Sequence, residues 1–301
     1  MGRLLAAGEF FWLDLHRPDA EDVRRLGELF GVHPLALEDA QHFGQRAKIE
    51  DYDHFAFLVA YGAAPDDDRL VEVHCFYSER FLVTVHRDEA PALAELRTEH
   101  GRRDRGPDEP ILVLHRVLDC LTDSFFSLLE ELDEAIDAIE ADLERGPSDR
   151  MQRSIFALRR RLIAIRKTVG PQRDMLGRLS GGVAELPGMT REAERYFRDV
   201  YDHLIRIGDL LESYRDLLSG AQDVYLATVS NRLNAVMKQL TVIATIFLPL
   251  TLVVGYFGQN FGWMVRRLDG LGDFLVFGVG VPLVVVLGLL AVFRRLGWIG
   301  G

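Results

Sequence analysis

The last fifth of this 301-residue chain contains two long runs without a charged side chain, from Gln239 to Val265 and from Phe274 to Phe293. An α-helix rises about 1.5 Å per residue, so about 20 apolar residues cross the roughly 30 Å hydrocarbon core of a bilayer. Both runs reach that length, and two such runs side by side are rare in soluble domains. We therefore predict membrane-spanning helices at about 239–257 and 274–294, joined by a loop over 258–273.

The charged residues lie almost entirely before Lys238, and the chain has a formal net charge of −11. An acidic surface disfavours nucleic acid as a partner, because binding a phosphate backbone needs clustered lysine and arginine. Cations are the natural partners of such a surface. Two spans place both termini on one side, and basic residues next to the spans predict that this side is the cytosol: Arg232, Lys238, Arg294 and Arg295. We expect a multi-pass protein of the cell membrane, although Arg266 and Arg267 in the loop oppose this orientation.

Residues 1–110 combine short strand-like runs with turn signals. The runs 55–61 and 71–86 are rich in β-branched and aromatic residues, and the segments 65–69 and 78–80 read as turns between strands. Apolar residues recur at helical spacing over 20–31, which ends in Gly31, and Pro34 suits the first turn of a helix over 34–40. This part is predicted to be a small cytoplasmic α/β domain.

Long helical patterns begin at residue 111 and are predicted over 112–145, over 150–179 and from Thr190 onward. Thr190 is a suitable N-cap, and no proline follows it before Pro249, so the third helix should continue from the body into the first span. The predicted fold is therefore an α+β membrane protein in three parts. These are the α/β domain at 1–110, a stalk or funnel of long helices at 111–238 and a two-helix transmembrane pore domain at 239–301.

One face of the first span carries residues that recur every three or four positions: Asn234, Met237, Thr241, Ala244, Leu248, Thr251 and Gly255. Polar groups lie near the ends of this face, and small or apolar groups lie in its middle. Such a face could line a pore with an apolar gate, but close packing between membrane helices explains threonine, alanine and glycine equally well. Two helices cannot enclose a water-filled path alone, so a pore requires several copies of the chain.

The segment NRLNAVMKQLTVIATIFLPLTLVVGYFGQNFGWM (231–264) resembles the pore helix and signature loop of the CorA family of magnesium transporters. Residues 196–231 resemble the stalk helix of that family, and the segments HPLALEDA and QRAKIEDYDHFAFLV resemble its N-terminal domain. The resemblance covers nearly the whole chain in the right order. It implies a homopentamer with a cytoplasmic funnel and passive, potential-driven entry of hydrated Mg2+, without an organic cofactor.

The resemblance also implies roles along the first span. By position, Asn234 would form an inner polar ring, Leu240 and Leu248 an apolar constriction, and Thr251 an outer polar ring. These roles depend on assembly, because each ring takes one side chain from every copy.

Gly258, Gln259 and Asn260 would form the selectivity loop, as a GQN variant of the GMN signature of the family. An amide ring suits Mg2+, which loses water reluctantly and can be held through its hydration shell. Gln259 departs from the usual methionine, and Arg266 and Arg267 make the loop basic, with Asp269 and Asp273 as counter-charges. Three functions stay open: a Mg2+ channel, a transporter of Zn2+, Co2+ or Ni2+ with or without proton coupling, and a membrane-anchored metal sensor that does not conduct.

A regulatory metal site is also implied by the resemblance. Asp199, in YFRDVYDH, matches the position at which cytosolic Mg2+ bridges acidic side chains of adjacent subunits and holds the pore shut. Its partner is expected in the N-terminal domain, at the turn formed by Asp66, Asp67 and Asp68. Asp199 and His203 stand four residues apart on one helical face, which suits a softer metal, whereas a solvated surface charge is the alternative.

The acidic run from Glu130 to Glu144 alternates with Leu132, Ile136, Ile139 and Leu143. This pattern is typical of a helix with one packed face and one solvated face, and a loose electrostatic sink for cations is the alternative. The sequence contains no HExxH motif, glycine-rich phosphate loop or evident Ser/His/Asp constellation, so it predicts a protein that is not an enzyme.

Overall fold

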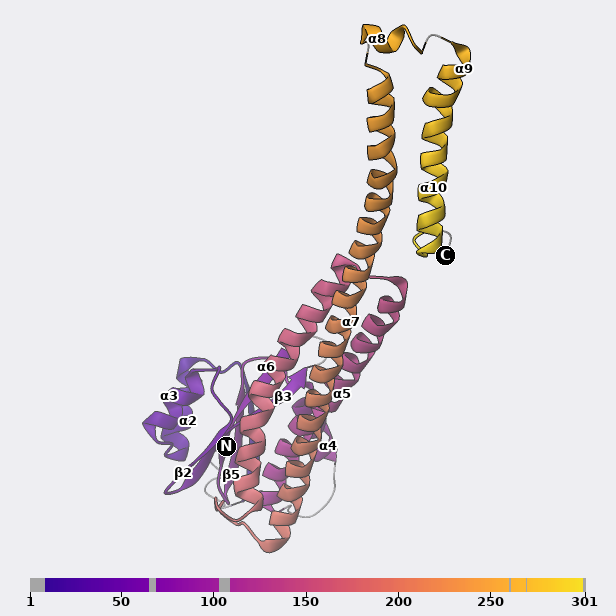
Figure 1. Cartoon of the computed structure of the whole chain (residues 1–301). Helices are drawn as coiled ribbons and strands as arrows, with labels where there is room; N and C mark the ends of the chain where they lie inside the picture. Colours follow the sequence, from indigo (N-terminus) through magenta and orange to yellow (C-terminus); the bar gives the residue numbers. More distant parts are fainter. Residues whose placement is uncertain (1–8, 65–68, 103–108, 260, 269, 300–301) are drawn as a thin grey trace. The chain divides into compact units, whose positions relative to one another are not determined.

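The computed structural model describes residues 9–64, 69–102, 109–259, 261–268 and 270–299 (Figure 1). The chain divides into two compact units, Met1–Asp223 and Val224–Gly301, and helix α7 (Arg191–Phe257) passes from the first into the second. The three-part division at 110/111 and 238/239 follows changes of sequence pattern rather than this compactness. Its boundaries stay predictions.

A five-stranded sheet lies at the centre of the first unit, with strand order β1-β5-β4-β3-β2. The strands are β1 (Phe11–His16), β2 (Lys48–Tyr52), β3 (Phe55–Ala64), β4 (Arg69–Tyr77) and β5 (Phe81–His86). Strands β2 to β5 form an antiparallel meander, and β1 pairs with β5 in parallel. The meander confirms the strands predicted within 55–61 and 71–86, with a turn at 78–80.

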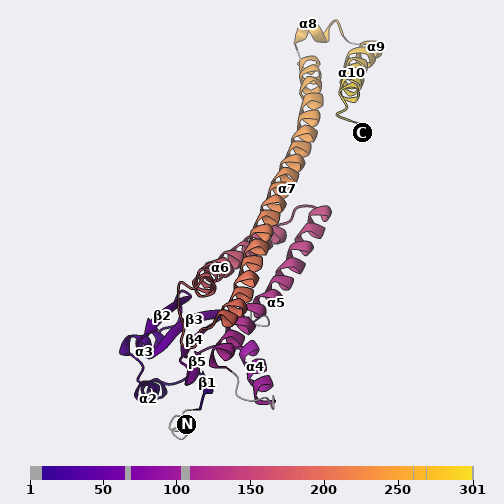
Figure 2. The same cartoon turned by 90° about the horizontal axis from the view of Figure 1, so that it is seen from below.

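Helices cover both faces of this sheet, as the two views in Figures 1 and 2 show. Helices α2 (Ala20–Phe30) and α3 (Pro34–Gln41) lie on one face, where Phe30 contacts the ring of Phe81. Helix α5 (Pro110–Arg145) lies on the other face and contacts β3. Every residue of β3 is buried, which explains why its sequence is a continuous apolar run rather than an alternating one.

Local capping sets both ends of α2, and the sequence predicts the C-terminal one. Asp19 forms a capping box with Asp22 at its N-terminus, and Gly31 ends the helix in the left-handed conformation at φ 65°. Thr190 caps α7 by accepting a hydrogen bond from the backbone N–H of Ala193 at 3.1 Å.

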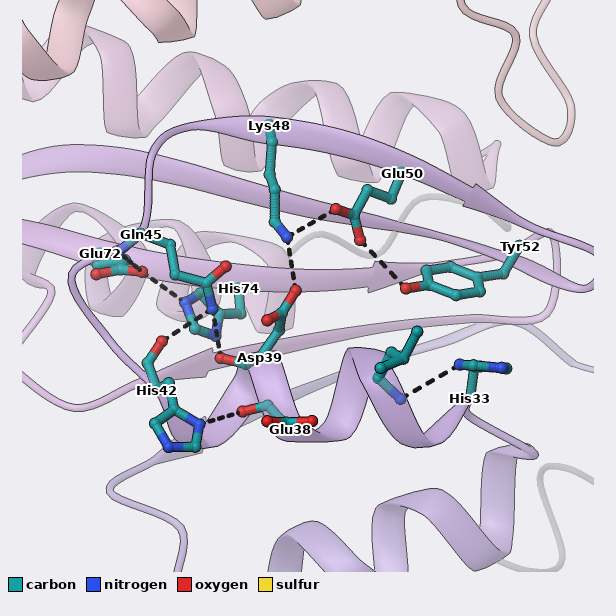
Figure 3. A network of polar contacts seen from close by, with 11 residues as sticks. His33, Glu38, Asp39, His42, Gln45, Lys48, Glu50, Tyr52, Glu72 and His74 are labelled. Carbon is teal, nitrogen blue, oxygen red and sulfur yellow. Dashed lines mark hydrogen bonds and ion pairs between the residues drawn. The ribbon is translucent and has the colours of Figure 1, made fainter.

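Ion pairs fix α3 to β2 in the segments that resemble the CorA N-terminal domain (Figure 3). Lys48 Nζ donates to Asp39 Oδ2 at 2.6 Å and to Glu50 Oε1 at 2.7 Å. Tyr52 donates to the other oxygen of Glu50 at 3.1 Å. These contacts give the segments a structural role, because they hold a helix against the edge strand of the sheet.

A buried carboxylate holds the loop between α3 and β2. Glu72 accepts hydrogen bonds from the backbone N–H groups of Gly44 and Gln45. His74 Nε2 lies 2.8 Å from Glu72 Oε1, and Figure 3 shows Glu72 with Gln45 and His74. Burial disfavours the charged form of Glu72, but these hydrogen bonds outweigh burial and lower its pKa. Gly44 has a φ of 95°, which favours glycine at this bend.

Strand β1 carries a second buried carboxylate. Asp14 accepts a hydrogen bond from Thr84 at 2.7 Å and lies 3.2 Å from His86 Nε2 and 3.3 Å from Arg97 of α4 (Pro91–Arg102). Burial opposes charge on both partners, yet their mutual contact lowers the pKa of Asp14 and raises that of His86. The His16 ring stacks on the His86 ring, with their centroids 4.9 Å apart.

Three long helices complete the first unit: α5, α6 (Asp149–Ser180) and the N-terminal part of α7. On α5, Leu132, Ile136 and Ile139 are buried while most of the intervening acids are exposed, so the predicted packed and solvated faces are confirmed. Side chains from these helices also complete the sheet. Strand β2 reaches only Val59, and beyond it the backbone of Tyr61 exchanges hydrogen bonds of 2.7 and 3.1 Å with the side chain of Gln172.

The second unit contains the rest of α7, then α8 (Gly262–Val265), α9 (Leu271–Asp273), a π-helix η2 (Phe274–Gly280) and α10 (Val281–Arg295). Helix α7 and the segment Leu271–Arg295 are long and apolar enough to cross a membrane, and their most apolar windows are not buried. The two helices contact at both ends. Lys238 Nζ donates to Gly297 O at 3.1 Å, and the rings of Phe257 and Phe277 lie 5.3 Å apart.

We predict that Gln172→Leu destabilises the first unit by about 3 kcal/mol, because it leaves both backbone groups of Tyr61 buried without partners. Thermal melting of the detergent-solubilised protein measures this loss. Gln152→Leu, at an exposed position of the same helix, should melt like the wild type. Equal melting temperatures for the two variants would contradict the bridging role of Gln172.

The Asp14–His86 pair predicts a pH dependence of stability. The raised pKa of His86 stabilises the fold below the unfolded pKa of about 6.5, and this contribution is lost as the pH rises through the folded pKa. The lowered pKa of Asp14 stabilises the fold above about pH 4 and loses its effect on acidification. Asp14→Asn should therefore flatten the fall in melting temperature between pH 6 and 9, whereas Asp51→Asn, an exposed control, should keep it.

Candidate pore and cytoplasmic metal site

Helix α7 presents two different faces within the second unit. One face is half-buried and contacts the second apolar helix. This half-buried face consists of Lys238, Val242, Ile246, Pro249, Leu250, Val253 and Phe257. The candidate pore residues are all exposed: Asn234, Met237, Leu240, Thr241, Ala244, Leu248, Thr251 and Gly255. Contacts within one chain therefore do not bury the candidate pore face of α7. Its role in lining a pore stays a prediction.

The two threonines of this face satisfy their own hydrogens. Thr241 Oγ1 donates to Met237 O at 2.8 Å, and Thr251 Oγ1 donates to Leu248 O at 2.9 Å. Each hydroxyl oxygen keeps lone pairs that can accept a hydrogen bond from water. A threonine held in this way can contact a hydrated cation without leaving an unpaired donor in an apolar setting.

The helix ends where the predicted selectivity loop begins. Gly258 N donates to Val254 O at 2.8 Å, and a Cβ at Gly258 would lie only 3.0 Å from that same oxygen. A larger residue at this position would therefore require the backbone around Val254 to shift by a few tenths of an ångström. Gln259 is exposed, and its backbone oxygen accepts from Phe261 N at 3.0 Å; Asn260 lies outside the described residues.

The basic loop between the two spans contains an arginine that bonds within the loop itself. Arg266 Nε donates to Gly262 O at 3.0 Å, and Met264 is the buried residue of α8. Asp273 is described and half-buried, whereas Asp269 lies outside the described residues. One of the two arginines therefore stabilises the short helix α8.

A cluster of possible metal ligands lies between α5 and α7 in the first unit. Ligand atoms of Asp119, Asp123 and His203 all lie within 4.8 Å of one another. His203 Nδ1 is 2.9 Å from Asp123 Oδ1, and His203 Nε2 is 3.9 Å from Asp199 Oδ2. Asp199 and His203 thus share a helical face, as predicted, and the structure adds two acids from α5. Asp66, Asp67 and Asp68, the predicted partners, lie outside the described residues.

The electrostatics of this cluster favour a cation. Burial and the nearby charges of Asp123 and Asp199 raise the pKa of Asp119 to about 6, although His203 opposes the shift. A divalent ion would relieve the repulsion between these carboxylates, and oxygen and imidazole ligands suit both Mg2+ and transition metals. The sequence interpretation missed Asp119 and Asp123. Their four-residue spacing in LDCLTD, which places both on one helical face, was the available signal.

Comparison with known proteins decides the family. The family described as CorA-like Mg2+ transporter protein matches residues 7–295. The chain belongs to the CorA family. Its members are ion transporters rather than enzymes, so this chain is a CorA-family divalent-cation transporter of a membrane.

Individual relatives of the CorA family support this assignment and leave the ion open. A cobalt/magnesium transport protein of Thermotoga maritima is 37% identical over 96% of this chain and 83% of its own length. A zinc transport protein of Pectobacterium carotovorum is 27% identical over 77% of this chain and 69% of its own. The complete structure of a magnesium transporter of this family from Methanocaldococcus jannaschii has a TM-score of 0.86 at 24% identity, covering 96% of this chain and 91% of that one, and so shares its fold.

We predict that divalent ions stabilise the first unit through the Asp119–Asp123–His203 cluster. At an ion concentration 100 times its Kd, the gain is about 2.7 kcal/mol, seen as a higher melting temperature with Mg2+ or Co2+. Asp123→Asn and His203→Ala should each remove most of this gain. Asp137→Asn, an exposed acid on the same helix, should retain it. An unchanged gain in Asp123→Asn would show that the ion binds elsewhere.

Proposed function

We propose that this chain is a passive Mg2+ channel driven by the membrane potential and assembled as a homopentamer. One observation carries the proposal: the candidate pore face of α7 is exposed along its whole length, while the neighbouring face contacts the second apolar helix. The cobalt/magnesium transport protein among the relatives supports Mg2+ as the ion. Several copies are needed because one hairpin cannot enclose a path for water.

Selection is proposed to occur at the loop Gly258–Gln259–Asn260. Gly258 follows directly on the end of α7, where its backbone N–H donates to Val254 O at 2.8 Å, and the amides after it are proposed to stand at the pore mouth. Amide oxygens bind the hydration shell of Mg2+ without stripping it, so the ion can leave again. Asn234 is proposed as the inner polar ring, Leu240 and Leu248 as the apolar constriction and Thr251 as the outer polar ring.

Regulation is proposed to occur at the cluster that includes Asp199 and His203. Mg2+ bound there by Asp119 and Asp123 would link α5 to α7, and the Asp66–Asp68 turn of an adjacent copy would supply a further partner for Asp199. High cytosolic Mg2+ would then hold the helices in the closed arrangement. Both termini are proposed to be cytoplasmic, with the first unit facing this regulatory ion.

A second candidate is a Zn2+ transporter, with or without proton coupling. The imidazole of His203 within the cluster favours a softer ion than Mg2+, and one relative is named for zinc transport. Parallel flux measurements with Mg2+ and Zn2+, each with and without a pH gradient, separate the two candidates. Uptake of Zn2+ that greatly exceeds Mg2+ uptake and grows with the pH gradient would replace the first proposal by the second.

We predict that Asn260→Ala lowers Mg2+ flux into proteoliposomes about tenfold or more, because the amide that orients the hydrated ion is lost. The flux should need no ATP. Gln152→Ala, which removes an exposed amide far along the chain from the loop, should conduct like the wild type. Full Mg2+ flux through the Asn260→Ala variant would contradict the proposed role of this loop in selecting the ion.

A further inference from the structure

A groove of about 390 Å3 runs between α6 and α7 in the first unit and combines an apolar floor with a basic rim. Phe156 and Ile163 are 47% and 56% exposed there, although both are large apolar side chains on a helix whose opposite face is buried. Leu211 of α7 also lines the groove. Exposed apolar residues gathered in one groove indicate a surface that binds a partner.

The rim of the groove is strongly basic. Arg159, Arg160, Arg166 and Arg215 line it, and α6 carries nine arginines and lysines against two aspartates. Arg159 bonds the side chains of Ser219 and Gln222 on α7, and Arg215 pairs with neighbouring acids of its own helix. Arg160 and Arg166 have no carboxylate partner within the described part of the chain. The groove therefore offers unpaired positive charge next to apolar surface.

Helix α5 presents the complementary surface. It carries ten acidic side chains against two arginines, and a stripe of acids is exposed along it: Glu130, Asp133, Glu134, Asp137 and Glu140. Of the acids on α5, Glu131 pairs with α6, through Arg161 at 2.8 Å. Ala138 and Ala141 are also exposed among these acids, and such small side chains leave room for larger ones from a partner.

The acidic stripe and the basic groove flank α7 on different sides. Tyr214 of α7 bonds Asp133 on the acidic side, whereas Ser219 bonds Arg159 on the basic side. These two α7 residues are five positions apart, which corresponds to roughly 140° around a helix. The acidic stripe of one copy can therefore reach only the groove of another copy, and such a contact between different faces generates rings when it closes.

We propose that the α6–α7 groove of one chain binds the acidic face of α5 from a second copy. Phe156 and Ile163 would pack against Ala138 and Ala141, while Arg160 and Arg166 would pair with acids of the stripe. The inference rests on the oligomer of the proposed function and adds the contact that joins its copies. Charge complementarity of this kind fixes register and excludes the wrong face.

Cysteine cross-linking of the full chain in detergent tests the contact. Ile163→Cys is combined in turn with Glu130→Cys, Glu134→Cys and Asp137→Cys, which sample about two turns of α5. The native Cys75 is buried and Cys120 half-buried, and burial raises the pKa of both thiols, so they should react slowly. At least one pair should give a ladder of covalent products beyond the dimer, because each copy offers both faces. Single variants and the pair Ile163→Cys with Glu21→Cys, an exposed site on α2, should give none.

Charge reversal gives a second test of the contact between copies. Arg160→Glu with Arg166→Glu should lower the cross-linked fraction about tenfold, and arginine at the two positions among Glu130, Glu134 and Asp137 that do not carry the cysteine should restore most of it. A ladder that stops at the dimer would indicate a symmetric contact and overturn the proposal. Absence of a ladder in every pair would also overturn it, whether lipid or another molecule fills the groove.

Mg2+ flux through the same variants distinguishes this inference from the proposed function. A ladder without flux supports the docking surface and contradicts the Mg2+ channel. Flux without a ladder contradicts the docking surface and leaves the channel standing.

Discussion

Inside a bilayer, a peptide group has no water with which to form a hydrogen bond, so the backbone must satisfy itself. This constraint explains why α7 continues as one helix through Pro249, which lacks an N–H and would more often end a helix in water. It also explains why Thr241 and Thr251 donate to carbonyls of their own helix. The face that remains has polar groups near its ends and small or apolar groups in its middle, a pattern that supports the proposed pore with an apolar gate.

In the first unit, the main electrostatic constraint is the burial of carboxylates. It buries Asp14 and Glu72 in the sheet and balances each with a histidine and further donors, so these carboxylates stabilise the fold while charged. Between α5 and α7 the balance is incomplete, because Asp119, Asp123 and Asp199 crowd around a single His203. A divalent cation bound there, as proposed, would complete the balance. Helix α7, which holds half of this cluster, continues into the second unit as the proposed pore helix.

The long elements were predictable from the sequence because periodicity is clear in long segments. The spans, the three long helices, α2, α3 and the meander follow from uncharged runs, helical spacing and the capping residues Gly31 and Thr190. Strands β1 and β2 and helix α4 were missed, since β2 reads KIEDY and its half-polar pattern reflects an edge position rather than a buried one. The metal cluster could be predicted only in part. Asp199 and His203 lie on one helix, whereas Asp119 and Asp123 join them through tertiary packing that sequence spacing does not encode.

The central claim is that Mg2+ crosses a pore built from the exposed face of α7 without any coupled energy source. Current through the reconstituted protein, measured against voltage at different Mg2+ gradients, tests this claim most directly. A passive divalent pore predicts a reversal potential that shifts by about 30 mV for each tenfold Mg2+ gradient and does not respond to pH gradients. A reversal potential that follows the proton gradient, or no current at any voltage, would contradict the account.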